Sequence, residues 1–373
     1  MQVGLVTTGF PRFEGDHSGA FLLTLARALV AHGHEVRVLA PEPTESRPSP
    51  AWPGIEVRWI PYLRPRALQR SFYGSGVPDN VRRRPSRWVG AATFTASLRL
   101  AAAPSLRNCD ALVSSWCIPN GWVASSIADG RPHLCICHAT DLRWLGRLPG
   151  RQTIARRIAR GASSMWFLSQ AHRQRFLEIA QIAPESIPTH LGPMPIEPPE
   201  DMAADRAKLR RQMGIEGFTL LFIGRLVPVK GVRDLLVAVA STPGVRVRIA
   251  GDGPERQELS ALCRRLGIDA VFEGWVAGAR KEALLRACDA LVVPSHRADG
   301  LPTVLFEARA RGLPIVATRA GAIPEALAQD RDVLLVPTGD PQALRRAIDT
   351  LRSAEEADAD AHGLTRCVPL GGR

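Results

Sequence analysis

Short apolar runs alternate with amphipathic segments along most of the chain. Residues 3–7 are typical of a buried strand, and apolar side chains then recur on one helical face at Phe21, Leu22, Leu25 and Leu29. Gly33 closes this helix, and residues 36–38 begin a second strand. A strand, a helix and another strand in this order form the repeating unit of a doubly wound parallel sheet.

The same alternation continues to about residue 348. Residues 41–85 are rich in proline and arginine, so we expect irregular structure there, with an edge strand near residues 55–60. Apolar strands separated by helical segments are expected at residues 111–114, 134–137, 165–169, 220–224, 245–250, 271–274, 290–293, 315–317 and 333–336. The fold class predicted is therefore α/β, with two parallel sheets.

Chain length and proline content set the expected domain boundaries. With 373 residues the chain favours two hydrophobic cores, and residues 184–199 are proline-rich, as in a semi-rigid linker. We expect an N-terminal domain at residues 1–190, a linker and entry segment at 191–216, and a second domain at 217–348. Residues 349–373 form a polar tail, for which disorder is expected from about residue 354.

Charge is the most unusual feature of the composition. The formal net charge is +12, and only three of the 48 basic residues are lysines: Lys208, Lys230 and Lys281. Residues 58–99 contain nine arginines and a single acid, Asp79. Base-composition bias in the genome explains such arginine content as well as function does. As a functional feature, the segment would attract an anionic membrane surface; nucleic acid is not expected, because aromatic residues are not interleaved with the arginines.

The cysteines indicate no metal centre or disulfide framework. Seven cysteines lack metal-ligand spacing, which favours reduced thiols in a cytoplasmic protein. Cys135 and Cys137 are two positions apart in an expected strand, and we expect them to face opposite sides. The first residues lack the pattern of a signal peptide, and no apolar run is long enough to span a bilayer. Any membrane role would be peripheral, at the inner face.

Ligands of doubly wound sheets bind beyond the carboxyl ends of the strands. Applied to this sequence, that rule selects five loops: Arg225 with Lys230, residues 251–253, Asp299 with Gly300, residues 9–19, and His138 with Asp141. We expect these loops to converge on a cleft between two facing domains. No phosphate-binding P-loop or dinucleotide fingerprint is present, so neither ATP hydrolysis nor hydride transfer is indicated.

The chemistry of these residues leaves alternatives open. Arg225 and Lys230 suit a diphosphate, although both could be solvated surface charges. Asp299 and Glu307 stand before and within a helix that begins at Thr303, and together could hydrogen-bond two parts of a polyhydroxylated ligand. A cap and a solvated helical residue would look the same. A lone histidine at a strand end, such as His138, is more often structural than catalytic.

Taken in order, the motifs resemble a known family over residues 3–348. They are GFPRFEGDHSGAF, GHEVRVLAP, HATD from His138, GRL with KG from Gly224, GDGP from Gly251, and DGLPTVLFEARARGLPIVAT from Asp299. The chain resembles the retaining glycosyltransferases of family 4, the group 1 proteins. That resemblance implies the GT-B fold, in which two Rossmann-like domains face each other across a cleft.

The resemblance also implies an activity and roles for the site residues. A sugar would move from a nucleotide diphosphate sugar to an acceptor hydroxyl with retention and without metal or cofactor. Arg225 and Lys230 would bind the diphosphate, Glu307 the ribose, and Asp299 the donor sugar. The expected catalytic set is His138, Asp299, Arg225 and Lys230. Donor contacts are further expected from Gly300, Leu301, Pro302, Thr303 and Gly19, and acceptor-side contacts from Gly15, His138 and Asp141.

Two positions and the C-terminal segment depart from the family pattern. Asp299 stands where the family usually has glutamate, Ala139 stands where it has glycine, and residues 354–373 do not resemble its long C-terminal helix. The leading hypothesis is a cytoplasmic glycosyltransferase of polysaccharide, glycolipid or glycosylated-metabolite synthesis, acting on a lipid-linked or soluble acceptor. A nucleotide-sugar 2-epimerase and a non-catalytic nucleotide-sugar binding protein are the alternatives.

Overall fold

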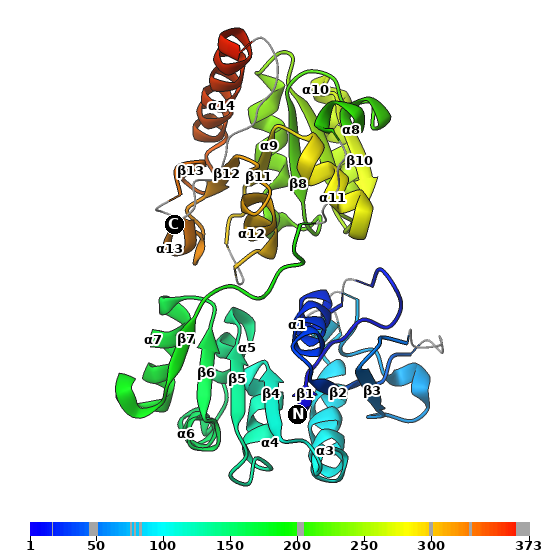
Figure 1. Ribbon diagram of the computed structural model, residues 1–373, viewed down its shortest axis with the longest axis vertical. Coiled ribbons are helices and arrows are strands. Elements are labelled where there is room, and N and C mark those ends of the chain that lie inside the picture. The colour runs from blue at the N-terminus through cyan, green and yellow to red at the C-terminus, as the bar shows by residue number, and fades with distance from the viewer. Residues whose placement is uncertain are drawn as a thin grey trace. The chain divides into compact units, whose positions relative to one another are not determined.

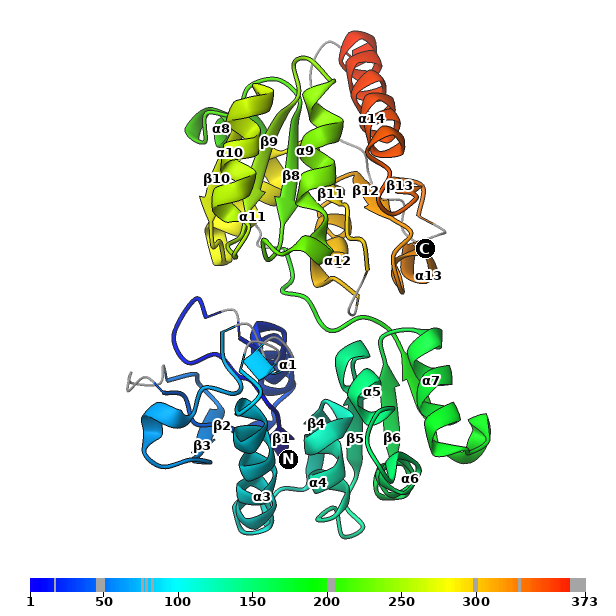
Figure 2. The same cartoon turned by 180° about the vertical axis from the view of Figure 1, so that it is seen from behind.

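The structure is a computed structural model that describes residues 1–16, 18–44, 51–74, 77, 80–81, 84–199, 205–297, 301–327 and 330–362. The chain divides into two compact units, one formed by Met1–Glu197 and the other by Pro198–Ala298 and Pro302–Arg373. Each unit consists of a twisted parallel sheet with helices packed against it (Figures 1 and 2). None of the helices in the described part combines the length and the apolar character that crossing a bilayer requires.

The first unit is built on a parallel sheet whose described strands run in the order β3-β2-β1-β4-β5-β6-β7. These strands are β1 (Gln2–Val6), β2 (Glu35–Pro41), β3 (Ile55–Ile60), β4 (Ala111–Ser115), β5 (His133–Cys137), β6 (Ser164–Phe167) and β7 (Thr189–Leu191). The described helices and short turns are α1 (Ala20–Ala31), η1 (Arg66–Leu68), α3 (Arg87–Leu106), η2 (Cys117–Gly121), α4 (Trp122–Ser125), α5 (Ala139–Leu145), α6 (Arg151–Gly161), α7 (Gln170–Ala180) and η3 (Pro184–Ser186).

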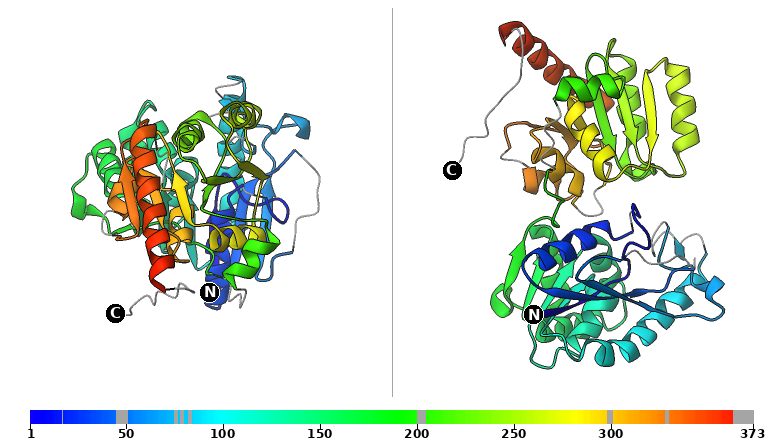
Figure 3. Two further views of the ribbon diagram at one scale, coloured as in Figure 1. Left: turned by 90° about the horizontal axis from the view of Figure 1, so that it is seen from above. Right: turned by 45° about the vertical axis from the view of Figure 1, so that its right-hand side comes forward.

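Helices cover both faces of this sheet, which explains why its central strands are apolar almost throughout. Helices α1 and α3 lie on opposite faces (Figure 3). Helix α3 contributes a stripe at a spacing of four residues, in which Phe94, Leu98, Ala102 and Leu106 are fully buried. That stripe packs with residues of β1, β2 and β3 in one hydrophobic cluster.

The second unit is built on a sheet whose described strands are also all parallel, in the order β10-β9-β8-β11-β12-β13. These strands are β8 (Thr219–Ile223), β9 (Arg246–Ala250), β10 (Ala270–Gly274), β11 (Ala290–Val293), β12 (Ile315–Thr318) and β13 (Val333–Val336). Its described helices and turns are α8 (Arg206–Gln212), η4 (Pro228–Lys230), α9 (Val232–Ala240), α10 (Arg256–Leu266), α11 (Gly278–Ala287), α12 (Thr303–Arg309), α13 (Ile323–Leu327) and α14 (Pro341–His362).

Strand order locates the point in each sheet where the winding reverses. In the first sheet this switch point lies between β1 and β4, and in the second between β8 and β11. Loops that leave such neighbouring strands turn in opposite directions, which opens a crevice at the carboxyl end of the sheet. The loops that carry Gly19 and Arg225 follow β1 and β8, so the topology places both at switch points.

Two Rossmann-like domains were predicted, and the structure confirms them. The boundary between the units falls at Glu197 and Pro198, seven residues after the predicted end of the first domain at 190. Part of the predicted linker segment is regular structure, because α8 lies within residues 191–216. The predicted edge strand at residues 55–60 is confirmed as β3.

The expected disorder from residue 354 is wrong as far as His362, where helix α14 ends. Leu344 and Ile348 anchor the first turns of α14 in the core of the second unit. Residues 354–361 alternate largely between alanine and acids, and a helix that packing has already nucleated propagates readily through alanine. Residues 363–373 lie outside the described residues.

The expectation that Cys135 and Cys137 face opposite sides of their strand is also wrong. Side chains two positions apart in a strand point to the same face. Both thiols are fully buried in one hydrophobic cluster together with Cys117.

Candidate active site

The loops after β8 and β9 are packed backbone against backbone. Leu226 N–H donates a hydrogen bond of 2.9 Å to Asp252 O. A Cβ atom at Gly251, whose φ is +145°, would stand 1.8 Å from Gly224 O, and a Cβ at Gly253 would stand 2.3 Å from Leu226 O. Glycine is therefore required at 251 and 253 by close approach of two loops. This explains the GDGP motif without any ligand.

The loop after β8 is also joined to the loop after β11. Gly231 adopts a left-handed conformation with φ +67°, and a Cβ there would stand 2.0 Å from Pro294 O. His296 N–H donates to Val229 O at 2.9 Å, and His296 Nε2 lies 2.7 Å from Asp234 Oδ2. The switch point of the second sheet is thus a tightly connected set of three loops.

Arg225 and Lys230 belong to the first of these loops. Arg225 follows β8 directly after Gly224, and Lys230 is the last residue of the turn η4. Both residues are partly buried. Two cations are therefore presented at the carboxyl end of a central strand, within a loop whose glycines let a ligand approach the backbone.

Glu307 lies on α12, and its side chain is one-tenth exposed. The ammonium of Lys281, on α11, lies 2.5 Å from Glu307 Oε2. Oε2 is buried and makes no aligned hydrogen bond, so the contact is an ion pair. Among the described residues, no other side chain forms a hydrogen bond or ion pair with this carboxylate.

A second pair of charges links α11 to Arg311, which lies two residues after the end of α12. Glu282 Oε2 accepts from Arg311 Nε at 2.7 Å, and Glu282 Oε1 accepts from Arg286 Nε at 2.7 Å. The Glu282 and Arg311 side chains are 4% and 6% exposed. Burial alone would raise the pKa of Glu282, but the hydrogen bonds from Arg311 and Arg286 hold it below its usual value.

The loop between β11 and α12 is described in part. Leu301 is buried, Pro302 is the residue before the helix, and Thr303 is its first residue. The predicted sugar-contacting residues Asp299 and Gly300 lie outside the described residues.

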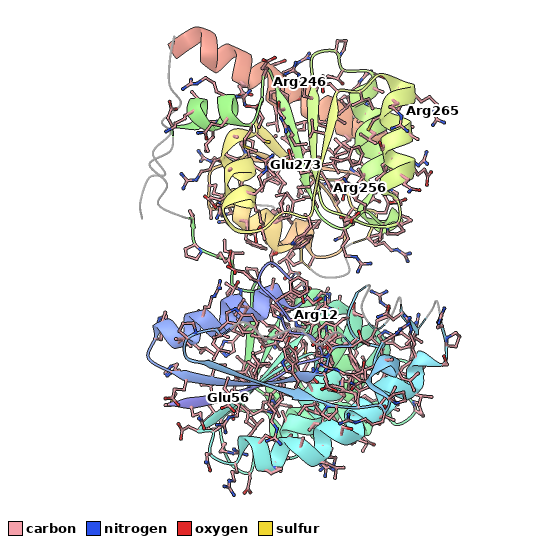
Figure 4. All side chains as sticks on the ribbon, turned by 90° about the vertical axis from the view of Figure 1, so that its right-hand side faces the viewer. Arg12, Glu56, Arg246, Arg256, Arg265 and Glu273 are labelled. Atoms are coloured by element: carbon pink, nitrogen blue, oxygen red, sulfur yellow. The ribbon has the colours of Figure 1, made fainter. Side chains whose placement is uncertain are left out.

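In the first unit, the loop between β1 and α1 is held by a buried carboxylate. Asp16 accepts hydrogen bonds from Arg12 N–H at 3.0 Å, Arg12 Nε at 2.7 Å and Ser18 N–H at 3.1 Å (Figure 4 marks Arg12). The Arg12 guanidinium also lies over the Tyr73 ring, 4.6 Å from its centroid. Burial alone would raise the pKa of Asp16, but the bonds from Arg12 and Ser18 lower it.

The glycines of this loop have different constraints. Gly19 caps α1 with φ +74°, and a Cβ there would stand 2.3 Å from Gly9 O, so the two ends of the loop touch. Gly15 has φ +82° with open space around a Cβ. Its conformation alone favours glycine.

His138 is buried at the carboxyl end of β5, where it caps α5. Its Nε2 lies 3.0 Å from Ser115 Oγ, and its ring is 4.9 Å from the ring of Trp116 and 5.6 Å from that of Phe21. Burial and the nearby charge of His172 lower the pKa of His138 to about 3. The imidazole is therefore neutral near pH 7 and cannot serve there as a charged acid.

Asp141 is buried and saturated by backbone donors. Its carboxylate accepts from Cys117 N–H at 2.6 Å and from His138 and Leu142 N–H at 2.9 Å each. Burial raises the pKa of Asp141 to about 7, although these hydrogen bonds oppose the shift. Asp141 thus joins the loop after β4 to the start of α5 and thereby fixes the position of His138.

One group of potential metal ligands occurs in the described part of the chain. The ligand atoms of Cys117, Cys137 and Asp141 lie within 4.8 Å of one another, and all three residues are buried. Burial raises the pKa of Cys117 to about 12 and that of Cys137 above its usual value, so both thiols hold their protons. Ligation of a metal ion would require both thiols to lose these protons.

Two family models match the chain. The model described as glycosyl transferase 4-like domain matches residues 18–188, and the model described as glycosyl transferases group 1 matches residues 217–353. The chain belongs to the group 1 glycosyl transferases. The family resemblance expected from the motifs is therefore confirmed.

Among curated relatives of this group 1 glycosyl transferase, the D-inositol 3-phosphate glycosyltransferase of Segniliparus rotundus is 32% identical over 41% of the chain. The chain spans between 36% and 43% of the length of this relative and two others. A wider match is the putative teichuronic acid biosynthesis glycosyltransferase TuaC of Bacillus subtilis, 23% identical over 93% of the chain and 88% of the relative.

Solved structures resemble the fold of this group 1 glycosyl transferase over nearly its whole length. Sucrose-phosphate synthase from Thermosynechococcus elongatus has a TM-score of 0.73 at 18% identity, covering 95% of this chain and 90% of the other. Anabaena HepE in complex with UDP has a TM-score of 0.64 at 20% identity, covering 97% and 95%. At these identities the likeness shows the fold.

The structure brings some predicted site residues together in each unit. Arg225, Lys230 and the GDGP glycines share one edge of the second sheet. His138 caps α5 and Asp141 lies in the first turn of that helix, where its carboxylate accepts a hydrogen bond from His138 N–H. The convergence of the two sets on one cleft stays a prediction, as do the individual roles.

Sequence reasoning missed several residues of the group 1 glycosyl transferase that the structure places at these loops or, for Lys281, on helix α11 beside Glu307. Lys281 was named only as one of three lysines, and Arg12 with Asp16 only as letters of a motif. Trp116, with φ +70°, and Ser115 were not selected at all, although the strand ending at Ser115 adjoins the switch point. A search of every strand end would have found them.

Proposed function

We propose that the chain is a retaining glycosyltransferase that transfers a sugar from a nucleotide diphosphate sugar to an acceptor hydroxyl without a metal or another cofactor. The observation that carries the proposal is the packed set of loops after β8, β9 and β11, which presents Arg225 and Lys230 at the switch point of the second sheet. Ligands of doubly wound sheets bind at such a position.

The two cations provide the electrostatics that such a reaction needs. As the bond between the anomeric carbon and the phosphate breaks, negative charge develops on the leaving diphosphate. Arg225 and Lys230 would stabilise that charge, since a guanidinium and an ammonium both donate to phosphate oxygens. Glu307 would accept hydrogen bonds from the ribose, and residues 299–303 would hold the sugar.

His138 contributes as a neutral group in this proposal. With a pKa of about 3, its imidazole can donate or accept one hydrogen bond but carries no proton to transfer near neutral pH. A pKa of about 3 also makes this imidazole a weak base, so we propose that the acceptor hydroxyl loses its proton to another group. The leaving phosphate oxygen is such a group, and a front-face reaction that uses it retains the configuration at the anomeric carbon.

The relatives support the substrate class in general terms. HepE was solved with UDP, and a mannosyltransferase of Mycobacterium tuberculosis, 29% identical over 58% of this chain and 59% of the relative, is named as GDP-mannose-dependent. TuaC is named as a putative teichuronic acid biosynthesis glycosyltransferase. We propose polysaccharide, glycolipid or glycosylated-metabolite synthesis in the cytoplasm, with a lipid-linked or soluble acceptor.

A peripheral position at the inner membrane face fits one surface of the first unit. Helix α3 exposes Trp88, Val89 and Leu100 by 43%, 57% and 79%. Exposed apolar side chains in a segment of the sequence that also carries many arginines would combine apolar insertion with attraction to anionic headgroups. Sedimentation with anionic vesicles at low salt, but not with neutral vesicles, would support this position; equal sedimentation would contradict it.

The proposal is tested by measuring thermal stabilisation with a panel of UDP-, GDP- and ADP-sugars, followed by turnover assays with the best binder. We expect one nucleotide sugar to raise the midpoint temperature of thermal unfolding. This increase should vanish in Arg225→Ala and Glu307→Ala. A sugar nucleotide altered without any acceptor would indicate the 2-epimerase instead. Binding without turnover or donor hydrolysis would indicate a binding protein, and no stabilisation by any member would overturn the site.

A further inference from the structure

The carboxylate of Glu307 is already held by a cation from a neighbouring helix. Lys281 on α11 and Glu307 on α12 are 26 positions apart in the chain, and their charged atoms are 2.5 Å apart. The Lys281 side chain is 27% exposed and that of Glu307 10%. Glu307 is therefore the more buried partner of this pair.

The residues next to this pair explain why the contact between Lys281 and Glu307 is well defined. Lys281 and Glu282 are consecutive on α11, and Glu307 and Arg311 are one helical turn apart. Glu282 pairs with Arg311, and Arg311 Nη1 also donates to Glu307 O at 2.8 Å. In one ion pair α11 supplies the cation, and in the other it supplies the anion. The two pairs thus fix α11 against α12 and leave Lys281 little freedom to contact another oxygen.

The choice of lysine is informative in a chain where arginine supplies 45 of 48 basic residues. An arginine would engage a carboxylate through two parallel hydrogen bonds and occupy both of its oxygens. The lysine ammonium is a point charge that contacts Oε2. Among the described residues, nothing forms a hydrogen bond or ion pair with Oε1.

We propose that Lys281 is a positioning residue that makes the site selective for ribose over 2′-deoxyribose. The inference rests on the proposed function, in which Glu307 accepts hydrogen bonds from the ribose. Lys281 holds Oε2, neutralises the buried carboxylate and orients Oε1 towards the sugar hydroxyls. A site that is built to hydrogen-bond a hydroxyl discriminates strongly against the analogue that lacks it.

The test compares the affinities of UDP, GDP and ADP with those of their 2′-deoxy analogues by isothermal titration calorimetry. We expect the wild-type chain to prefer the ribose form of its best nucleotide about tenfold or more. Lys281→Met keeps most of the aliphatic stem but removes the charge, and should reduce that preference to about threefold or less. Lys281→Arg keeps the ion pair and the fold, yet should also lose preference because the guanidinium covers Oε1.

Lys208→Met is the matched control, since Lys208 is an exposed lysine on α8 of the same unit. It should leave the preference unchanged. Circular dichroism and thermal unfolding of each variant establish that the fold is intact, and loss of preference in folded Lys281→Arg is a result that a purely structural ion pair would not produce.

Glu307→Gln separates this inference from the proposed function. If Glu307→Gln loses the preference while Lys281→Met and Lys281→Arg keep it, Glu307 binds ribose without help from Lys281 and the inference is overturned. If Glu307→Gln also keeps it, the ribose site itself is wrongly assigned. Loss in all three variants supports both.

Discussion

Gly231 lies directly against the carbonyl group of Pro294, and a Cβ at position 231 would stand 2.0 Å from Pro294 O. The contact joins the first residue before α9 to the residue that follows β11. Through it, the loop that carries Lys230 and the loop that leads to α12 keep a fixed relationship. A side chain at 231 must separate these two loops.

Gly231→Ala should therefore destabilise the second unit by more than the cost of placing alanine in a left-handed conformation. The left-handed conformation costs alanine about 1–2 kcal/mol, and overpacking against the carbonyl adds about 1–3 kcal/mol. Gly267→Ala is a matched control, because Gly267 has φ +65° with open space around a Cβ. Urea unfolding should show the larger loss for Gly231→Ala, and equal losses would mean that the loops separate at no cost.

The pair formed by Arg12 and Asp16 makes the loop before α1 sensitive to a single substitution. The Asp16 side chain is fully buried and that of Arg12 is 15% exposed. Asp16→Asn leaves the guanidinium without its counter-charge, which should lower the free energy of unfolding by about 3 kcal/mol. Because the pKa of Asp16 is lowered in the folded state, this contribution is present above its unfolded pKa and is lost as pH falls through the folded pKa.

Limited trypsin digestion at Arg12 and urea unfolding would measure both effects of Asp16→Asn. Glu178→Gln is the control, since its pair with Arg175 is about half exposed on both sides and should change stability by less than about 1 kcal/mol. If trypsin cleaves at Arg12 no faster in Asp16→Asn than in the wild-type chain, the carboxylate does not hold the loop.

The parts of this molecule that the sequence predicts are those that follow from periodicity and strand direction. Strands such as Leu220–Gly224 are apolar throughout because helices cover both faces, so their order along the chain indicates two parallel sheets. Residues after strand ends, such as Arg225 and Lys230, are then predicted at one edge because all strands point the same way. No contact has to be known for either inference.

Contacts between distant segments could not be predicted in this way. Glu307 was expected to face a ligand, and its partner Lys281 lies on another helix at no fixed spacing from it. Asp141 was expected on the acceptor side, whereas its oxygens accept from three backbone N–H groups that only the folded loops bring together. The error over Cys135 and Cys137 is different in kind, because strand geometry alone would have corrected it.

Glu282 should tolerate substitution poorly. Its carboxylate, 4% exposed, lies between Arg286 and Arg311, and Arg311 is itself 6% exposed. Glu282→Gln removes the charge that compensates a buried guanidinium, which should cost about 3–5 kcal/mol. Urea unfolding measures the loss, and Glu258→Gln, at an exposed pair with Arg233, serves as the control. Similar losses in the two variants would show that the buried pair contributes no more than the exposed one.

His138 and Asp141 should give opposing pH dependences to the stability of the first unit. The pKa of His138 falls from 6.5 to about 3 on folding, so between these values the unfolded chain binds the proton and stability falls as pH falls. The pKa of Asp141 rises from 3.8 to about 7, so over that window the folded chain binds the proton and stability falls as pH rises. Each group contributes a slope of up to about 1.4 kcal/mol per pH unit.

The two slopes overlap between about pH 4 and 6.5, where they offset each other in the wild-type chain. Removing one group should therefore expose the other. Relative to wild type, His138→Gln should lose stability progressively as pH rises through this window, while Asp141→Asn should gain stability over the same range, whatever constant loss each substitution causes. Urea unfolding at several pH values measures the difference from wild type, and differences that stay constant with pH in both variants would show that neither group titrates differently in the folded chain.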